Sequence, residues 1–250
     1  MLEAFYATER GSLEDATING SFDLHPELVW IDLIAPSQEE QQWVFDAYER
    51  NLPTLKSLED ISSSARFYRD DDGILHISTY FLTKNKNYQV DGDTDESSHM
   101  LATVQTVAFI LHKDRLFTMR GEKLVAFRAF RARARRNDYN MDYKDPTWIL
   151  LGLLEAKLDE LADILEDIHK DLERYSTEVL NNHHRETLLD LDDMITRLAQ
   201  QEDMLGKAQL CLIDLRRVLT FLSRPRALGS HIYDADIREL SEDVRSLVEH

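Results

Sequence analysis

A run of apolar residues spaced alternately four and three positions apart constrains this chain more than any other feature. The run starts at Leu154 and ends at Val179. Its members are Leu154, Leu158, Leu161, Leu165, Ile168, Leu172, Tyr175 and Val179. A heptad seam of this kind packs one helix lengthwise against another. The chain must therefore contain a long helix with a single apolar stripe and a helical partner for it.

A second seam supplies that partner. The polar residues from Asn181 to His184 break the first run, and apolar positions then recur as far as Leu222. They are Leu191, Ile195, Leu198, Leu205, Ala208, Leu212, Leu215, Leu219 and Leu222. Two helices joined by a short polar turn predict an antiparallel hairpin. A third helix is predicted for residues 234–250, and because it ends without a cap we expect the chain to be cut from something longer.

The front of the chain mixes strand and helix signals, which predicts an α/β fold for residues 1–145. Strands are expected at 28–33 and in two hairpins, one around Asp70–Gly73 and one around Lys113–Arg115. Helices are expected after Pro36, where Ser37 and Glu40 form a capping box, and over 54–63 and 123–136. The polar stretch 84–100 is expected to be a loop. We divide the chain into 1–145, 146–228 and 229–250.

The net charge of −18, from 47 acidic and 29 basic residues, disfavours a general nucleic-acid-binding protein. The single cysteine, Cys211, excludes an intrachain disulfide and a thiolate metal cluster, and its place on the second seam suggests the core. The N-terminus has no signal-peptide pattern, and no apolar run approaches the ~20 residues of a membrane helix. These features favour the cytoplasm.

Charges are unevenly distributed. The predicted helix at 123–136 is basic, whereas the helix carrying the first seam is acidic, and between Glu155 and Glu173 its carboxylates face only Lys157 and Lys170. We expect the two helices to be partners. The acidic face has two readings, a solvated surface or one that attracts cations.

No signature of catalysis is present: the sequence has no nucleophile elbow, phosphate-binding glycine loop, paired-cysteine spacing or His-Glu-x-x-His. We therefore expect no enzyme. Glu59 and Asp60 offer adjacent carboxylates, either as ordinary helix-end charges or as ion ligands completed by an acid from elsewhere. His183 and His184 are a weak metal signal, better explained as solvated turn residues.

An ordered series of short motifs resembles the CorA magnesium/cobalt transporters, in particular their proteobacterial subgroup, over nearly the whole chain. The motifs are Met1-Leu2-x-Ala4-Phe5, Val29-Trp30-Ile31-Asp32-Leu33-x-x-Pro36, Leu58-Glu59-Asp60-Ile61-x-x-Ser64-Ala65-Arg66-Phe67, Asp70-Asp71-Asp72-Gly73, Arg115-Leu116-Phe117-Thr118, Ala126-Phe127-Arg128, Arg131-x-Arg133-Ala134-Arg135, Leu172-Glu173 and Leu210-Cys211-Leu212-x-Asp214. The family's Gly-Met-Asn signature and its two C-terminal membrane helices do not occur in these residues.

The resemblance implies an α/β/α sandwich followed by a long antiparallel helical hairpin and the start of a stalk helix, assembled as a pentamer. It places the chain at the cytoplasmic face of the bacterial inner membrane, joined to the membrane through C-terminal helices. It also implies a regulatory role, in which Mg²⁺, or Co²⁺ or another divalent cation, binds between subunits and favours the closed state. The ligands it implies are Glu59 and Asp60 on one subunit and Glu239 and Asp243 on its neighbour.

Two alternatives remain beside this reading. The first is a zinc-transporting relative in the same superfamily, which the single cysteine and the scattered histidines disfavour. The second is a soluble coiled-coil adaptor that never meets a membrane.

Overall fold

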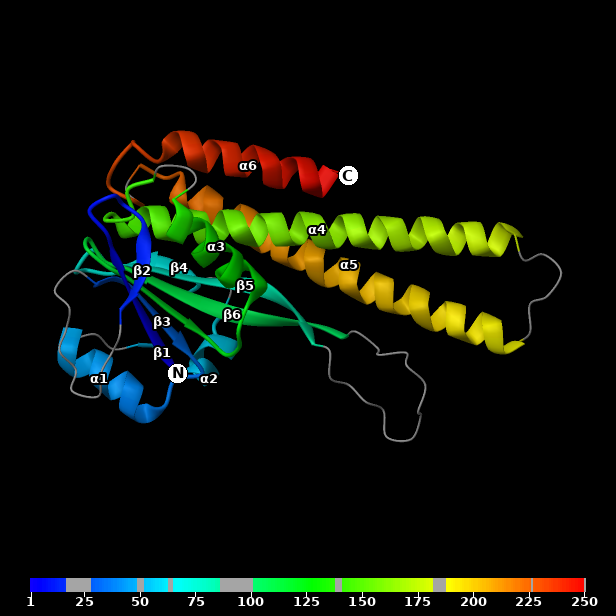
Figure 1. The fold of residues 1–250 in the computed structure, drawn as a ribbon, viewed down its shortest axis with the longest axis horizontal. Helices are drawn as coiled ribbons and strands as arrows, with labels where there is room; N and C mark the ends of the chain where they lie inside the picture. The colour runs from blue at the N-terminus through cyan, green and yellow to red at the C-terminus, as the bar shows by residue number, and fades with distance from the viewer. Residues whose placement is uncertain are drawn as a thin grey trace.

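The computed structural model describes residues 1–16, 28–48, 52–62, 65–85, 101–137, 141–181, 188–225 and 227–249. These residues form a mixed sheet with helices on both faces, and two long helices extend far beyond the sheet (Figure 1). The predicted α/β/α sandwich, helical hairpin and further C-terminal helix are therefore confirmed. The predicted divisions at residues 145 and 228 stay a prediction.

The sheet has seven strands in the order β2-β1-β3-β7-β6-β5-β4. Their bounds are Leu2–Ala7 for β1, Leu13–Ala16 for β2, Leu28–Ile34 for β3, Phe67–Arg69 for β4, Leu75–Asn85 for β5, Leu101–Leu111 for β6 and Leu116–Arg120 for β7. Strands β3 and β7 pair in parallel, and every other neighbouring pair is antiparallel. The central strands β3 and β7 are buried along their full length, including the charged Asp32 of β3 and Arg120 of β7.

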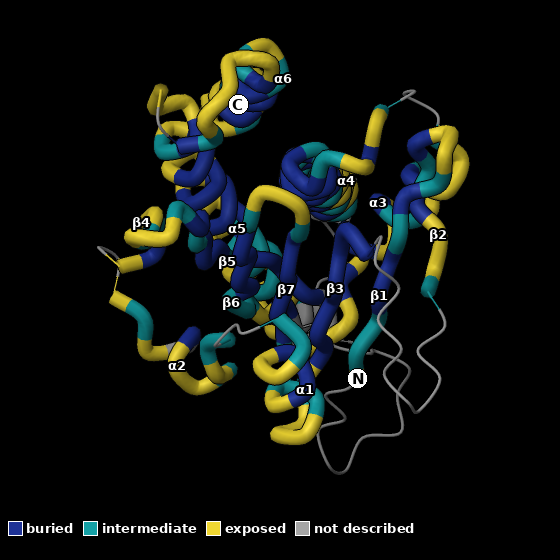
Figure 2. Tube along the Cα trace, turned by 90° about the vertical axis from the view of Figure 1, so that its left-hand side faces the viewer, coloured by how far each residue is buried: buried dark blue, intermediate teal, exposed yellow. Residues whose placement is uncertain are grey.

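Helices cover both faces of this sheet. Their bounds are Gln38–Tyr48 for α1, Leu55–Glu59 for α2, Val125–Arg136 for α3, Pro146–Asn181 for α4, Leu188–Leu222 for α5 and Asp234–Glu249 for α6. Helices α1 and α2 lie on one face, whereas α3, α4 and α5 lie on the other, and α6 lies outermost on that second side (Figure 2).

Most of the predicted local structure is confirmed. The capping box forms, because the Glu40 amide donates to the Ser37 hydroxyl and the Ser37 amide donates to the Glu40 carboxylate. The turn at Asp70–Gly73 joins β4 to β5. Gly73 has φ +79°, a left-handed conformation that residues with a side chain rarely adopt. Strands β1 and β2 were not predicted from the sequence, and α2 is shorter than expected. The predicted loop 84–100 starts too early, because Lys84 and Asn85 belong to β5. Its other residues, 86–100, and His183 and His184 lie outside the described residues.

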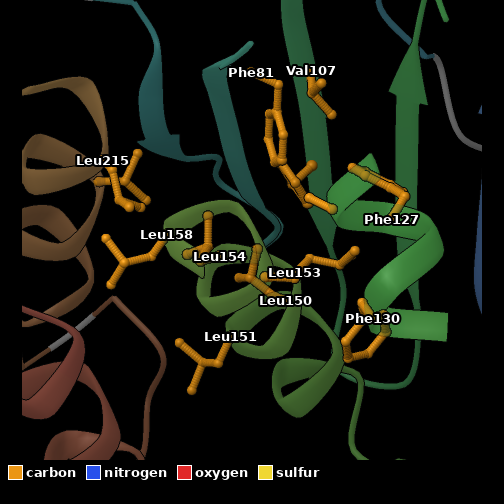
Figure 3. Packing of buried hydrophobic residues seen from close by; sticks show 14 of the residues in the cluster. Phe81, Val107, Phe127, Phe130, Leu150, Leu151, Leu153, Leu154, Leu158 and Leu215 are labelled. Carbon is orange, nitrogen blue, oxygen red and sulfur yellow. The ribbon is translucent and has the colours of Figure 1, made fainter. Parts of the chain in front are cut away.

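The main hydrophobic core lies between the sheet and the long helices. Leu150, Leu153 and Leu154 of α4 point toward Phe81 of β5 and Phe127 of α3 (Figure 3). Each such side chain contributes about 1.5–3 kcal/mol when it is fully buried. Cys211 is buried in this core, as expected, and its burial raises the pKa of the thiol to about 11.

Gly152 allows α3 to pack directly on α4. A Cβ at this position would lie 2.4 Å from Cε2 of Phe130, which is itself buried. The glycine that interrupts the apolar run at the start of α4 is therefore required by helix packing. A smaller second core, on the other face of the sheet, holds Trp43 and Val44 of α1 and Leu58 of α2.

Candidate functional site

An acidic groove of about 350 Å³ runs over α4, between α3 and α6. Its carboxylates are Glu155, Asp159, Asp236, Glu239 and Asp243, and we call this set with its lining the acidic groove. Its floor is apolar and includes Phe130, Leu151 and Leu240. The groove thus brings the predicted Glu239 and Asp243 together with two acids of the first heptad helix.

The sequence of α6 explains why its acids line the groove. Ile237, Leu240 and Val244 are buried and form the stripe that packs against the rest of the protein. Asp236, Glu239 and Asp243 each immediately precede one of these buried residues, so all three border the stripe on the same side. The helix cannot bury its apolar stripe without placing these carboxylates beside α4.

The electrostatics of the groove are those of crowded like charges. Glu155 is half-buried, and desolvation raises the pKa of its carboxyl group. Asp159, Glu239 and Asp236 raise this pKa further, while the Arg133 guanidinium opposes them. Arg133 also pairs with Asp159 at 2.8 Å, so one cation partly balances five carboxylates. This surface would bind an added cation favourably.

The other predicted pair, Glu59 and Asp60, lies elsewhere. Thr54 is the N-cap of helix α2, and its hydroxyl accepts from the Ser57 amide, while Leu58 anchors the helix in the second core. Asp60 caps its C-terminal end and is exposed. The side chain of Glu59 is outside the described residues. Because α2 and α6 lie on opposite faces of the sheet, Asp60 does not meet Glu239 or Asp243 within one chain (Figure 1).

The expectation that Lys157 opposes the acidic face of α4 is wrong. Its side chain is fully buried between α4 and the sheet, where the ammonium donates to the Thr79 hydroxyl at 2.9 Å and lies 3.9 Å from Asp214. Burial lowers the pKa of Lys157, and Asp214 opposes this shift. Position 157 belongs to the buried side of the helix because α4 packs against both β5 and α5.

Sequence reasoning missed the cluster around Asp214. This carboxylate accepts from the Thr79 hydroxyl at 2.5 Å and the Tyr80 amide at 2.9 Å, and it pairs with Arg66 at 3.3 Å. The guanidinium of Arg66 also donates to the Tyr80 hydroxyl. One signal was present in the sequence: Asp214 is the only acidic residue in the second half of α5.

The predicted partnership of the basic and acidic helices is only partly confirmed. Arg133 of α3 pairs with Asp159 of α4, and the Ala126 amide donates to Glu160 at 3.3 Å. Arg131 and Arg135 instead pair with Glu3 of β1 and Asp15 of β2. The basic helix thus also forms ion pairs with β1 and β2, the two strands that the sequence did not predict.

The described residues lack two features, a metal-binding cluster within one chain and a membrane-spanning helix. Within that part of a single chain, no three acidic, histidine or cysteine side chains gather closely enough to hold a metal ion. No helix among those ranges combines the length and apolar character needed to cross a membrane.

Comparison with known proteins identifies the family. A family model described as "CorA-like Mg2+ transporter protein" matches residues 26–250. The chain belongs to this CorA-like family. The membership confirms the resemblance seen in the sequence motifs and, since the family is one of transporters, the expectation that the chain is not an enzyme.

Individual CorA relatives agree with this assignment. The chain is 39% identical over 223 residues to the magnesium transport protein CorA of Escherichia coli (strain K12), and 37% identical over 222 residues to that of Mannheimia succiniciproducens. Each match covers 89% of this chain and 64% of the relative, so the chain spans less than two thirds of their length. The soluble domain of CorA from Methanocaldococcus jannaschii has the same fold, with a TM-score of 0.68 at 15% identity over 100% of this chain and 90% of that one.

Proposed function

We propose that this chain is the cytoplasmic, divalent-cation-sensing domain of a CorA-like Mg²⁺/Co²⁺ transport channel at the bacterial inner membrane. Mg²⁺ bound between neighbouring subunits of a pentamer would favour the closed state. The observation that carries the proposal is the acidic groove, where five carboxylates meet one guanidinium beside an apolar floor. Family membership supplies the transport context.

The donor set fits the ion. Carboxylate oxygens are the protein ligands that Mg²⁺ takes, usually one or two per ion, with water completing the shell. Glu239 and Asp243 of one subunit would hold the ion together with Glu59 and Asp60 of the next. Asp60 and Glu239 are both exposed and lie on different sides of one chain, as a site shared by two copies requires.

The regulatory step follows from the repulsion between these groups. Without a cation, acidic surfaces of neighbouring subunits repel each other. Inside one chain, burial raises the pKa of Glu155, and the neighbouring Asp159 and Glu239 add to this shift. A cation that binds between two subunits removes this repulsion only while they are close. Its binding therefore shifts the population toward the assembly in which those surfaces meet.

Magnesium-dependent thermal stability tests the proposal. The wild-type chain should unfold at a higher temperature as MgCl₂ is added, because an ion that binds only the folded assembly stabilises it, by about 1.4 kcal/mol at ten times its dissociation constant. Asp60→Asn should lose most of this shift. Asp163→Asn, which removes an exposed carboxylate from α4 outside the groove, should keep it.

Two outcomes would overturn the assignment. A wild-type chain whose unfolding temperature and sedimentation are unaffected by magnesium lacks the proposed sensor. An Asp60→Asn variant that keeps the full magnesium shift removes α2 from the site.

A further inference from the structure

Helix α6 carries Glu239 and Asp243, so the contacts that hold α6 also determine where these two carboxylates lie. The helix packs on the rest of the protein through its buried apolar stripe, Ile237, Leu240 and Val244. Hydrophobic burial is non-directional. The stripe therefore determines which side of α6 is buried more strongly than it determines the angle at which α6 crosses α4.

A directional contact lies at the N-terminal end of α6. Tyr233 directly precedes the helix and is buried. Its hydroxyl donates to Oδ2 of Asp145, and its ring packs edge-on against Trp148 of α4, with 5.0 Å between the two ring centroids. Burial raises the pKa of Tyr233, and the bond to Asp145 raises it further, so the hydroxyl stays protonated and remains a donor.

Asp145 joins this contact to the start of α4. It directly precedes the helix, and its Oδ1 accepts from the Thr147 amide at 2.9 Å, as the side chain of an N-cap residue does. Its other oxygen, Oδ2, accepts from Tyr233. One carboxylate therefore caps α4 and also holds the start of α6. We call Asp145, Trp148 and Tyr233 the joint.

The joint lies at one end of the acidic groove, where α4 and α6 begin to run side by side (Figure 1). Trp148 is part of the groove lining. Glu239 and Asp243 follow Tyr233 by six and ten residues, about 9 and 15 Å along the helix. A change in the angle between the two helices therefore displaces both carboxylates, and Asp243 by more than Glu239. Mg²⁺ demands near-ideal ligand geometry, so the angle decides whether these carboxylates are in place to bind it.

We propose that Tyr233 and Asp145 are positioning residues, which hold α6 at the angle to α4 that the magnesium response requires. The inference rests on the proposed magnesium sensing and adds the contact that places two of its ligands. Without the bond between Tyr233 and Asp145, α6 keeps its apolar stripe but adopts a wider range of angles. The carboxylates are then in place in only a fraction of the molecules, and the apparent dissociation constant for Mg²⁺ rises in inverse proportion to that fraction.

Two conservative variants break this hydrogen bond and keep its surroundings. Tyr233→Phe retains the ring against Trp148, and Asp145→Ser retains an oxygen for the Thr147 amide, since serine caps a helix about as well as aspartate. Each variant should raise the MgCl₂ concentration at the midpoint of the thermal shift at least about threefold. The double variant should shift the midpoint no further than either single variant, because both changes remove the same bond.

Tyr6→Phe is the matched control. The Tyr6 hydroxyl also donates to a carboxylate, that of Glu14 at 2.8 Å, but this bond joins β1 to β2, outside the groove. The control should leave the magnesium midpoint unchanged. A purely structural role for Tyr233 would lower the unfolding temperature of Tyr233→Phe without moving the midpoint.

Pulsed electron paramagnetic resonance in EDTA measures the position of α6 without magnesium. Nitroxide labels at Asp163→Cys and Arg245→Cys, two exposed positions, mark α4 and α6, and dilution with unlabelled chain confines the measured distances to one chain. Cys211 should stay unlabelled, because it is buried. Tyr233→Phe should shift or broaden the distance distribution by about 2 Å or more, since Arg245 lies about 18 Å along α6 from the joint. Tyr6→Phe should leave the distribution unchanged.

The results separate the joint from the magnesium sensor. The proposal is overturned if Tyr233→Phe has the wild-type distance distribution, or if its magnesium midpoint matches that of Tyr6→Phe. A wild-type chain without any magnesium shift would overturn the proposed function instead. In that case the distances still decide about the joint, because a distribution altered by Tyr233→Phe supports the positioning of α6 and an unaltered one overturns it.

Discussion

Two clusters of buried charge in this protein differ in how their charges are neutralised. In the first, Asp32 of β3 and Arg120 of β7 are both fully buried and form a balanced pair. The guanidinium donates to the carboxylate through Nη2 at 2.6 Å and Nε at 3.2 Å, and Thr118 donates a third bond at 2.7 Å. In the second, Arg66 and Lys157 share the single carboxylate of Asp214 at 3.3 and 3.9 Å.

The difference follows from the elements that each cluster joins. The balanced pair joins two adjacent parallel strands, whose spacing the sheet already fixes, so close two-point geometry is available. The Asp214 cluster joins β5, α4 and α5, which approach from different layers. Its ion pairs are longer, at 3.3 and 3.9 Å, and among the described residues Nε of Arg66 has no hydrogen-bond partner. The sheet therefore contains a saturated pair, whereas the junction between layers carries an excess of buried positive charge.

Removing Asp214 should have the largest effect. Asp214→Ala leaves two buried cations without their carboxylate, and we expect a loss of about 3–5 kcal/mol in the free energy of unfolding, measured by urea titration. Asp32→Ala is the matched control, because it strands only one cation. Its loss should fall at the lower end of that range. A larger loss for Asp32→Ala would reverse the comparison.

Removing Lys157 should make the second cluster resemble the first. Lys157→Met keeps the side-chain volume and leaves one cation for one anion, so the free energy of unfolding at pH 7 should stay within about 1 kcal/mol of wild type. Its pH dependence should differ. Burial lowers the pKa of Lys157 in the folded chain, so the unfolded chain holds that proton more tightly.

The direction in which stability changes with pH follows from this lowered pKa of Lys157. Above the folded pKa of Lys157 and below its ordinary value of about 10.4, wild-type stability should rise with pH, because the unfolded state binds more protons. Lys157→Met should lack this component, and Lys113→Met, at an exposed turn, should retain it. Urea titrations across alkaline pH measure the difference. Parallel pH profiles for wild type and Lys157→Met would contradict the prediction.

The smallest effect concerns Cys211, which lies beside this cluster on α5. Burial raises the pKa of its thiol to about 11, so very little thiolate forms at pH 8. Iodoacetamide should leave the thiol unmodified in the native chain and alkylate it readily in urea, as read by mass spectrometry. Rapid native alkylation would mean that the layers separate at the Asp214 cluster.

The sequence predicted those elements whose signal is local. Heptad spacing indicated the helices that include Leu154 and Leu215, and the capping box at Ser37 and Glu40 indicated the start of α1, because neighbouring residues determine both. Strand β1 escaped prediction because it is held by pairing with β3, more than twenty residues along the chain, and β2 in turn pairs with β1. Lys157 was misassigned for a similar reason, since only the packing of α4 on β5 decides which of its faces is buried.

The candidate site was only partly predictable. The acids of α6 border an amphipathic stripe that is visible in the sequence, and Glu239 and Asp243 do lie in the groove. The contribution of Glu155 and Asp159 depends on how α6 crosses α4, which no local pattern encodes. Asp60 was found through the family motif, and its exposure at the end of α2 depends on the anchoring of Leu58 in the second core.

The length of α4 has a mechanical consequence. Helix α4 is 36 residues long, about 54 Å at 1.5 Å per residue, and the sheet holds only its N-terminal part (Figure 1). Its remainder acts as a lever arm with its pivot in the core. A rotation of about 5° around Leu158 would carry the tip at Asn181 through about 3 Å, given the ~35 Å of helix between them. Displacements too small to disturb the packing around Phe81 thus become atomic-scale travel at the far end of the hairpin.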